Sequence, residues 1–151
     1  MRKFIYCLLV AIMFVACAKK QPKQVGDIIE INGVEGVIFD VSEDGQHGKA
    51  LSVVQAYLDW CGANDWYSSL GENWDIATNE ELSVVYAKKS VINAALRENG
   101  YQELGSDTYW ALMIDSDGLR CQGRFFMDTA SFVYGDDYRF IPDNVRIVTK
   151  F

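Results

Sequence analysis

Only a few residues of this chain are of the types that carry out covalent chemistry. His47 is the sole histidine, and Cys61 and Cys121 are the two cysteines that follow residue 17. A histidine activates a thiol as a nucleophile by taking its proton, but no motif places His47 beside either cysteine. The pattern therefore indicates a protein that is not an enzyme and that needs no cofactor.

The acidic residues form no recognisable catalytic or metal-binding motif. Glu80 and Glu81 are adjacent, and neighbouring residues on a helix point in different directions, so the two carboxylates cannot share one reacting atom. Asp115 and Asp117 stand in the sequence Asp-Ser-Asp-Gly, which supplies far fewer oxygen ligands than a calcium loop requires. We interpret this sequence as a hairpin turn and expect no metal site.

The N-terminus has the pattern of an export signal. A basic pair precedes thirteen unbroken apolar residues, 4–16. Such a segment is too short to cross a bilayer core of about 30 Å but is typical of a secretory leader. The leader ends in Phe14-Val15-Ala16-Cys17, which resembles a bacterial lipobox, and this resemblance implies that Cys17 carries a lipid anchor. The alternative is an ordinary signal peptide cleaved near Ala16 or Ala18.

Composition and charge indicate one exported domain. We expect a leader over residues 1–16, a tether over 17–25 and a single domain over 26–151. The protein is expected in the cell envelope, with the outer membrane favoured and the choice between periplasm and cell surface left open. Removal of the leader with its two basic residues changes the net charge from −7 to −9. Nucleic-acid-binding proteins carry a basic surface, so we expect no nucleic-acid partner and a membrane contact through the lipid on Cys17.

The two remaining cysteines are candidates for a disulfide. Export would place Cys61 and Cys121 in an oxidising compartment, where cysteines commonly pair. Such a bond would stabilise the fold by roughly 3–4 kcal/mol on the chain-entropy estimate. Two buried free thiols are one alternative and a catalytic thiol is another, because the sequence does not set the distance between the Cα atoms.

The N-terminal half of the domain shows strand patterns followed by a short helical one. Asn32-Gly33 is a strong two-residue turn signal between apolar alternations, so we expect a β-hairpin over residues 27–41. A third apolar segment covers residues 49–54. A short helix is predicted over 55–61, and the aromatic-rich stretch 64–74 is interpreted as an irregular loop.

The C-terminal half begins with helices and ends with strands. Thr78 and Glu81 have the spacing of a capping box, in which each side chain accepts a hydrogen bond from the other residue's backbone N–H. A second helical stretch ends at Asn99-Gly100. Strand patterns occupy residues 108–114, 119–127, 131–134 and 145–151. This order predicts an α+β domain with a hairpin first, one or two helices in the middle and an antiparallel sheet at the end.

Four spaced motifs resemble those of a known family of exported bacterial proteins. They are Gly36-Val37-Ile38-Phe39 with Gly45-Gln46-His47-Gly48, then residues 74–82, then Tyr109-Trp110, and last Val145-Arg146-Ile147-Val148 with Phe151. The family consists of Bacteroidetes-type lipoproteins with a Legionella-collagen-like C-terminal domain, often filed as domains of unknown function. It is similar to C-type-lectin-like and formylglycine-generating-enzyme-like folds. The resemblance covers residues 26–151 and implies a C-type-lectin-like fold with paired termini, 27–31 beside 145–151.

The aromatic residues divide between the core and the surface. Trp74 and Trp110 lie in the family motifs and are expected in the core. Trp66 and Tyr67 lie in a polar stretch and are candidates for an exposed, ligand-binding surface, with packing as the alternative. His47 is expected to hold its turn through side-chain hydrogen bonds or to contact a ligand.

These residues together favour a membrane-anchored, non-enzymatic binding module for a protein or a glycan ligand. Residues 61–74 and 128–144 are the candidate recognition loops, and Arg146 is expected to be a structural partner of a carboxylate. One alternative is a structural or assembly subunit of an envelope or fimbrial complex. Another is an unrecognised enzyme on a formylglycine-generating-enzyme-like scaffold.

Overall fold

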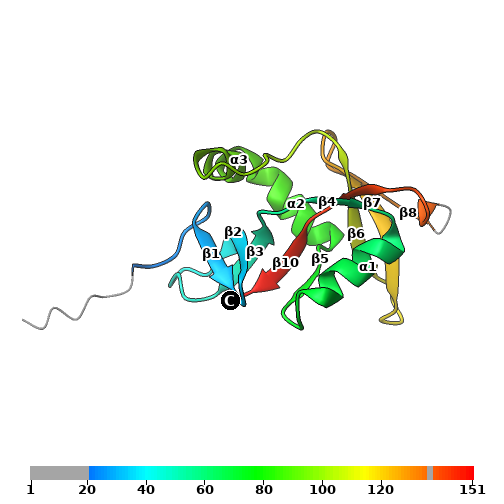
Figure 1. Cartoon of the computed structure of the whole chain (residues 1–151), viewed down its shortest axis with the longest axis horizontal. Helices are drawn as coiled ribbons and strands as arrows, with labels where there is room; N and C mark the ends of the chain where they lie inside the picture. Colours follow the sequence, from blue (N-terminus) through cyan, green and yellow to red (C-terminus); the bar gives the residue numbers. More distant parts are fainter. Residues whose placement is uncertain (1–20, 136–137) are drawn as a thin grey trace, which may run out of the picture.

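Two five-stranded sheets form the framework of the computed structural model, which describes residues 21–135 and 138–151 (Figure 1). Sheet A contains, in spatial order, β1 (Ile28–Ile31), β2 (Val34–Val41), β3 (Gly48–Ser52), β10 (Ile147–Lys150) and β5 (Trp74–Ile76). Sheet B contains, in spatial order, β4 (Ala56–Leu58), β9 (Asp143–Val145), β6 (Thr108–Ile114), β7 (Arg120–Phe126) and β8 (Ser131–Tyr134). The candidate leader and the lipidation candidate Cys17 lie outside the described residues.

Sheet A begins with the predicted hairpin. Asn32 and Gly33 join β1 to β2 with positive φ angles of 53° and 80°, as a tight two-residue turn requires. The expected pairing of the first and last strands is wrong, because β1 pairs only with β2 while β10 lies between β3 and β5. Strands β2 and β3, which pair with each other, therefore lie between β1 and β10.

Sheet B is built around the hairpin of β6 and β7. The Asp115 carboxylate accepts backbone hydrogen bonds from Asp117 at 2.9 Å and from Leu119 at 2.8 Å, which confirms the predicted turn. The predicted strand over 131–134 is also confirmed as β8, which pairs with β7. The pairings in the sheet are antiparallel except for a parallel contact between β6 and β9.

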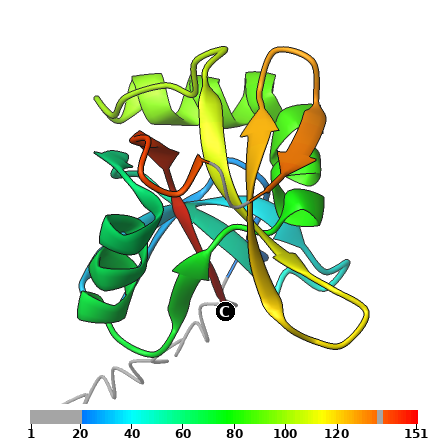
Figure 2. The same cartoon turned by 90° about the vertical axis from the view of Figure 1, so that its right-hand side faces the viewer.

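The described residues contain three helices: α1 (Trp60–Ser69), α2 (Asn79–Ala87) and α3 (Lys89–Glu98). The predicted capping box begins α2, with Thr78 accepting from the Glu81 backbone and Glu81 accepting from that of Thr78. The helix predicted over 55–61 is wrong: β4 occupies its first part, and Asp59 caps a helix that runs through the predicted loop. Figure 2 shows α1 on one side of β10 and α2 on the other.

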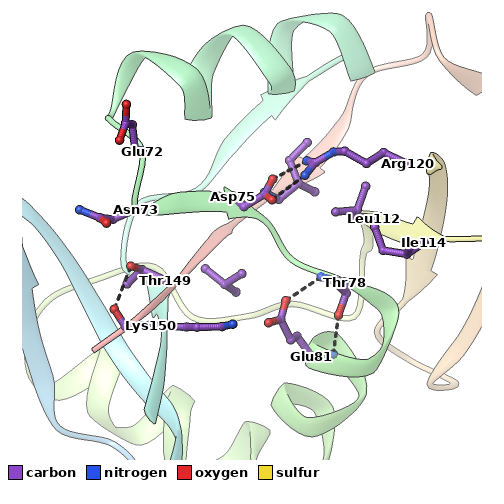
Figure 3. Close-up of a pocket in the computed structure, with 12 residues that line it drawn as sticks. Glu72, Asn73, Asp75, Thr78, Glu81, Leu112, Ile114, Arg120, Thr149 and Lys150 are labelled. Atoms are coloured by element: carbon purple, nitrogen blue, oxygen red, sulfur yellow. Dashed lines mark hydrogen bonds and ion pairs between the residues drawn. The ribbon is translucent and has the colours of Figure 1, made fainter. Parts of the chain in front are cut away.

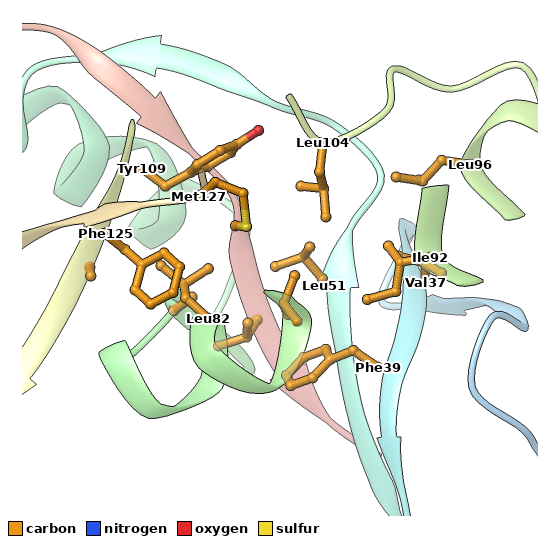
Figure 4. Packing of buried hydrophobic residues seen from close by; sticks show 14 of the residues in the cluster. Val37, Phe39, Leu51, Leu82, Ile92, Leu96, Leu104, Tyr109, Phe125 and Met127 are labelled. Atoms are coloured by element: carbon orange, nitrogen blue, oxygen red, sulfur yellow. The ribbon is translucent and has the colours of Figure 1, made fainter. Parts of the chain in front are cut away.

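Buried side chains form two hydrophobic clusters. The larger one joins both sheets to α2 and α3, and Figure 4 shows side chains such as Leu51, Leu82 and Tyr109 meeting there. The smaller one lies beneath α1 and includes Trp110. Trp74 and Trp110 are 2% and 1% exposed, so their expected place in the core is confirmed.

Arg146 lies where the chain crosses from sheet B to sheet A, between β9 and β10. Its guanidinium is 1% exposed and donates hydrogen bonds to the backbone carbonyls of Ser52, Val53 and Gln102 and to Gln55 Oε1. The expected carboxylate partner is wrong, since none of the ion pairs within the described residues involves Arg146. Burial lowers the pKa of Arg146 to about 10, which leaves the group charged at neutral pH.

Two of the three backbone carbonyls that accept from Arg146 belong to another crossing between the sheets. Ser52 and Val53 lie at the end of β3, where the chain leaves sheet A for β4 in sheet B. The guanidinium therefore links two of the four places at which the chain passes between the sheets, β3 to β4 and β9 to β10. The arrangement confirms a mixed α+β architecture, and in the part of the chain that is described no helix is long and apolar enough to cross a membrane.

Candidate functional site

The two aromatic residues predicted to form a recognition surface lie on α1 and not in a loop. Successive helix positions point in different directions, and the two side chains are separated accordingly. Trp66 lines a hollow together with Val34, Val53 and Leu70. Tyr67 faces the other way, and its ring lies beside the guanidinium of Arg120 at 5.9 Å from the centroid. Both side chains also pack against the smaller hydrophobic cluster.

His47 holds its loop through its backbone, and this differs from the expected side-chain bonding. Its N–H donates to Ser42 Oγ at 3.1 Å, and its carbonyl accepts from the Ser42 backbone at 2.8 Å. The Asp44 carboxylate also holds the loop, because it accepts from Ser42 Oγ and from the Gln46 backbone. These hydrogen bonds, that from Ser42 first, lower the pKa of Asp44. The imidazole stays exposed and borders only a shallow hollow.

The candidate disulfide between Cys61 and Cys121 is not formed in the structure. Cys61 is a free and exposed thiol in the first turn of α1. Cys121 is half-buried on β7, and its Sγ faces the β6–β7 turn at 3.8 Å from Asp115 Oδ2. The two sulfur atoms therefore have separate surroundings, and the alternative of two buried thiols does not fit the exposed Cys61.

A groove lies between the edge of sheet A and the β6–β7 hairpin. It has a volume of about 440 Å³, within the range of roughly 300–1,000 Å³ for small-ligand sites. Figure 3 shows Asp75 of β5 and Arg120 of β7 in direct contact at one side of it. The guanidinium donates to both carboxylate oxygens, at 2.6 and 2.8 Å. This two-point geometry fixes the orientation of both side chains.

Arg120 is shared by three neighbouring hollows. Besides the groove, it borders a hollow of about 560 Å³ with Trp60 and Tyr134, and another of about 370 Å³ with Tyr67 and Asn73. We call the combined region the Arg120 surface, defined by Trp60, Tyr67, Asn73, Asp75, Arg120 and Tyr134. It brings the neighbouring elements α1 and β5 together with β7 and β8, which follow more than 40 residues later in the sequence.

Opposite charges are paired around this surface. The hydrogen bond from Arg120 to Asp75 raises the pKa of the guanidinium, so Arg120 stays charged. Deeper in the groove, Glu81 binds Lys49 at 3.0 Å while it completes the capping box of α2. Across the described residues, no group of three or more metal-binding side chains is placed to hold a metal ion. The side chains of the surface offer hydrogen bonding through Asn73, Asp75 and Arg120 and aromatic contact through Trp60, Tyr67 and Tyr134.

Sequence reasoning identified Tyr67 but missed its partners. Arg120 and Asp75 are 45 residues apart, and no local pattern connects them. Trp60 falls inside the helix predicted over 55–61, whereas in the structure it is the first residue of α1. The sequence signal for the start of α1 is Asp59, because aspartate is a favoured N-cap residue. In the structure its carboxylate accepts a hydrogen bond from the Gly62 backbone N–H.

Two comparisons with known proteins found no relative of this chain. No protein-family model matches the chain, and a search of curated proteins found no significant match.

Proposed function

We propose that this chain is a lipid-anchored, non-catalytic binding module and that the Arg120 surface holds its protein or glycan ligand. The observation that carries the proposal is that three hollows all border Arg120, which forms a bidentate ion pair with Asp75. The pair joins β7 to β5, which belong to different sheets. Preformed concave sites with a few well-placed polar groups are typical of ligand binding. The aromatic side chains around the pair supply contact area at low entropic cost.

The proposal includes an anchor in the cell envelope, with the outer membrane favoured. The lipobox-like sequence that ends at Cys17 supports it. Metabolic labelling with a clickable fatty acid is expected to mark the protein and to leave the Cys17→Ala variant unmarked. An unlabelled wild-type protein would contradict the anchor without affecting the proposed ligand site.

We also propose kinship with the lipoproteins that carry a Legionella-collagen-like C-terminal domain and with the C-type-lectin-like fold. The sequence motifs support this, as does the order of a hairpin, helices and an antiparallel hairpin sheet. The position of β10 between β3 and β5 departs from the terminal pairing that such a fold implies. The kinship concerns the scaffold, and a scaffold does not determine a ligand.

The binding function is tested by capture from the native envelope. Tagged wild-type protein, Arg120→Ala and Arg97→Ala are isolated in mild detergent, and co-purifying proteins and glycans are identified by mass spectrometry. Arg97 is a matched control because it also forms an exposed ion pair, with Glu103 at 3.1 Å, but does not border the Arg120 surface. Surface ion pairs contribute only about 0–1 kcal/mol, so both variants should fold.

The expected result is a captured component that is retained by Arg97→Ala and lost with Arg120→Ala. Equal capture by all three proteins, or no capture by any, would argue against the Arg120 surface as the ligand site.

One observation favours the second candidate, a subunit of an envelope or fimbrial assembly. Strand β8 is an outer strand of sheet B, and large apolar side chains are exposed on it and shortly after it. They are Val133, Tyr134, Tyr138, Phe140 and Ile141. Contiguous exposed apolar residues commonly mark protein contacts. A partner captured in fixed stoichiometry and lost with Phe140→Ser, but kept by Arg120→Ala, would favour this function.

A further inference from the structure

The charges that line the groove leave little net charge to attract an ion. Asp75 is matched by Arg120, and Glu81 is matched by Lys49. The remaining charged side chains of the groove, Glu72 and Lys150, are again one of each sign. The whole chain has a net charge of −7, so it disfavours a phosphorylated or sulfated polymer through long-range repulsion.

Polar groups on the Arg120 surface can both donate and accept hydrogen bonds. The Asp75 carboxylate offers acceptors and the Arg120 guanidinium offers donors in one plane, because their bidentate pairing aligns the two groups. Asn73 adds an exposed amide with both functions. A ligand that suits this set carries several neutral hydroxyl groups, since each hydroxyl donates and accepts as well.

Aromatic rings border the same surface on two sides of Arg120. Trp60 and Tyr134 line the hollow over β7, and Tyr67 lines the next one. Trp60 is held in place by an edge contact with buried Trp110, at 5.4 Å between centroids and 63° between planes. Tyr134 is 61% exposed and lines this hollow.

We infer that the ligand of the Arg120 surface is a neutral oligosaccharide. Sugar rings present apolar C–H faces that stack on aromatic side chains, and hydroxyl edges that match the Asp75–Arg120 pair and Asn73. Hollows of about 440 and 560 Å³ that share Arg120 accommodate more than one ring. Trp60 and Tyr134 bind one sugar ring over β7, and the next ring places its hydroxyls at Asp75. This inference rests on the proposed binding function and narrows its ligand class.

The inference is tested with a printed oligosaccharide array. The lipidated full-length protein, in a detergent without a sugar headgroup, is applied to neutral glucans, mannans, galactans and N-acetylglucosamine oligomers beside sulfated and sialylated glycans. Affinity for the best neutral glycan is then measured by isothermal titration. Thermal unfolding of each variant confirms that it is folded.

Two variants and two matched controls give the result its meaning. Tyr134→Ala and Arg120→Ala should each weaken binding of the neutral glycan at least about tenfold, which is about 1.4 kcal/mol. Tyr57→Ala removes a tyrosine that is as exposed, at 67%, but lies on β4 outside the surface, and it should leave affinity unchanged. Arg97→Ala should do the same.

Other outcomes overturn the inference and separate it from the proposed function. Binding only to sulfated or sialylated glycans, or neutral binding that is insensitive to both Tyr134→Ala and Arg120→Ala, contradicts the assignment. If the array gives no binding while envelope capture of a protein still depends on Arg120, the saccharide inference fails and the binding function stands. If neither assay depends on Arg120, both fail.

Discussion

Replacing Arg146 with methionine removes the guanidinium that links the β3–β4 and β9–β10 crossings but keeps most of the side-chain volume. The backbone carbonyls of Ser52, Val53 and Gln102 would then lose a buried donor. Each unsatisfied buried group costs about 1–3 kcal/mol. The variant also avoids burying a charge, which costs several kcal/mol in the wild-type protein. Because the carbonyls belong to the backbone and remain in place, we expect a net loss of about 3 kcal/mol in the free energy of unfolding.

This loss is measured by urea unfolding at pH 7, followed by the fluorescence of the four tryptophans. A loss of about 3 kcal/mol should lower the melting temperature by roughly 10 °C in a domain of this size. Arg146→Lys keeps the charge but lacks the planar fork that reaches several acceptors, so its loss should be smaller than that of methionine. Arg97→Met, at an exposed ion pair, should change the stability by less than about 1 kcal/mol.

Two results would refute the reasoning. A methionine variant as stable as the wild-type protein would mean that the carbonyls find other donors or water. A more stable variant would mean that the cost of burying the charge exceeds the value of its hydrogen bonds, as happens when some buried ion pairs are replaced by apolar residues.

Three further changes test local features. Ser42→Ala should raise the pKa of Asp44 toward its ordinary value in a carbon NMR titration, because the Ser42 hydroxyl is the main cause of its lowering. A carboxyl with a lowered pKa stabilises the fold above its ordinary pKa and loses that effect as the pH falls through the lowered value, so the variant should lose less stability in acid. An unchanged Asp44 titration would contradict this prediction. Thr78→Ala should cost about 1 kcal/mol in urea unfolding through loss of the helix cap, and a loss near zero would show that the Glu81 bond suffices. Gly123→Ala should lower the free energy of unfolding by about 1–3 kcal/mol through overpacking, since its Cβ would lie 2.3 Å from Phe132 Cζ. Recovery of stability in the double variant with Phe132→Leu supports this cause, and a double variant without recovery contradicts it.

The parts of the fold that the sequence predicts correctly are those with local causes. Asn32-Gly33 forms its turn because glycine and asparagine tolerate positive φ, and Thr78 with Glu81 closes its capping box within three residues. The Asp115 turn likewise uses bonds to the next few residues. These interactions need nothing from the rest of the chain, so residue type and spacing suffice.

The parts that could not be predicted depend on distant contacts. Helix α1 contains glycine, asparagine and serines, which favour loops, and it is stabilised by packing of Ala63, Trp66 and Tyr67 on the smaller hydrophobic cluster. Arg146 alternates with apolar residues, a pattern typical of an outward-facing residue on a strand. It is nevertheless buried, and the carbonyls that accept its hydrogen bonds belong to segments 44 to 94 residues away in the sequence. The Asp75–Arg120 pair has the same origin, so the sequence predicts the candidate site only through Tyr67 and the candidate loops 61–74 and 128–144, which contain Asn73 and Tyr134.

The central position of β10 in sheet A bears on when the domain can fold during its synthesis. Strands β3 and β5 are made early, but the strand that belongs between them comes only with residues 147–150. Non-local pairings of this kind are formed late and slowly. Sheet A therefore stays open on the ribosome until almost the whole described chain has emerged. On the proposed export route, this delay would keep the chain unfolded for passage through a translocation channel, and folding would follow on the far side of the membrane.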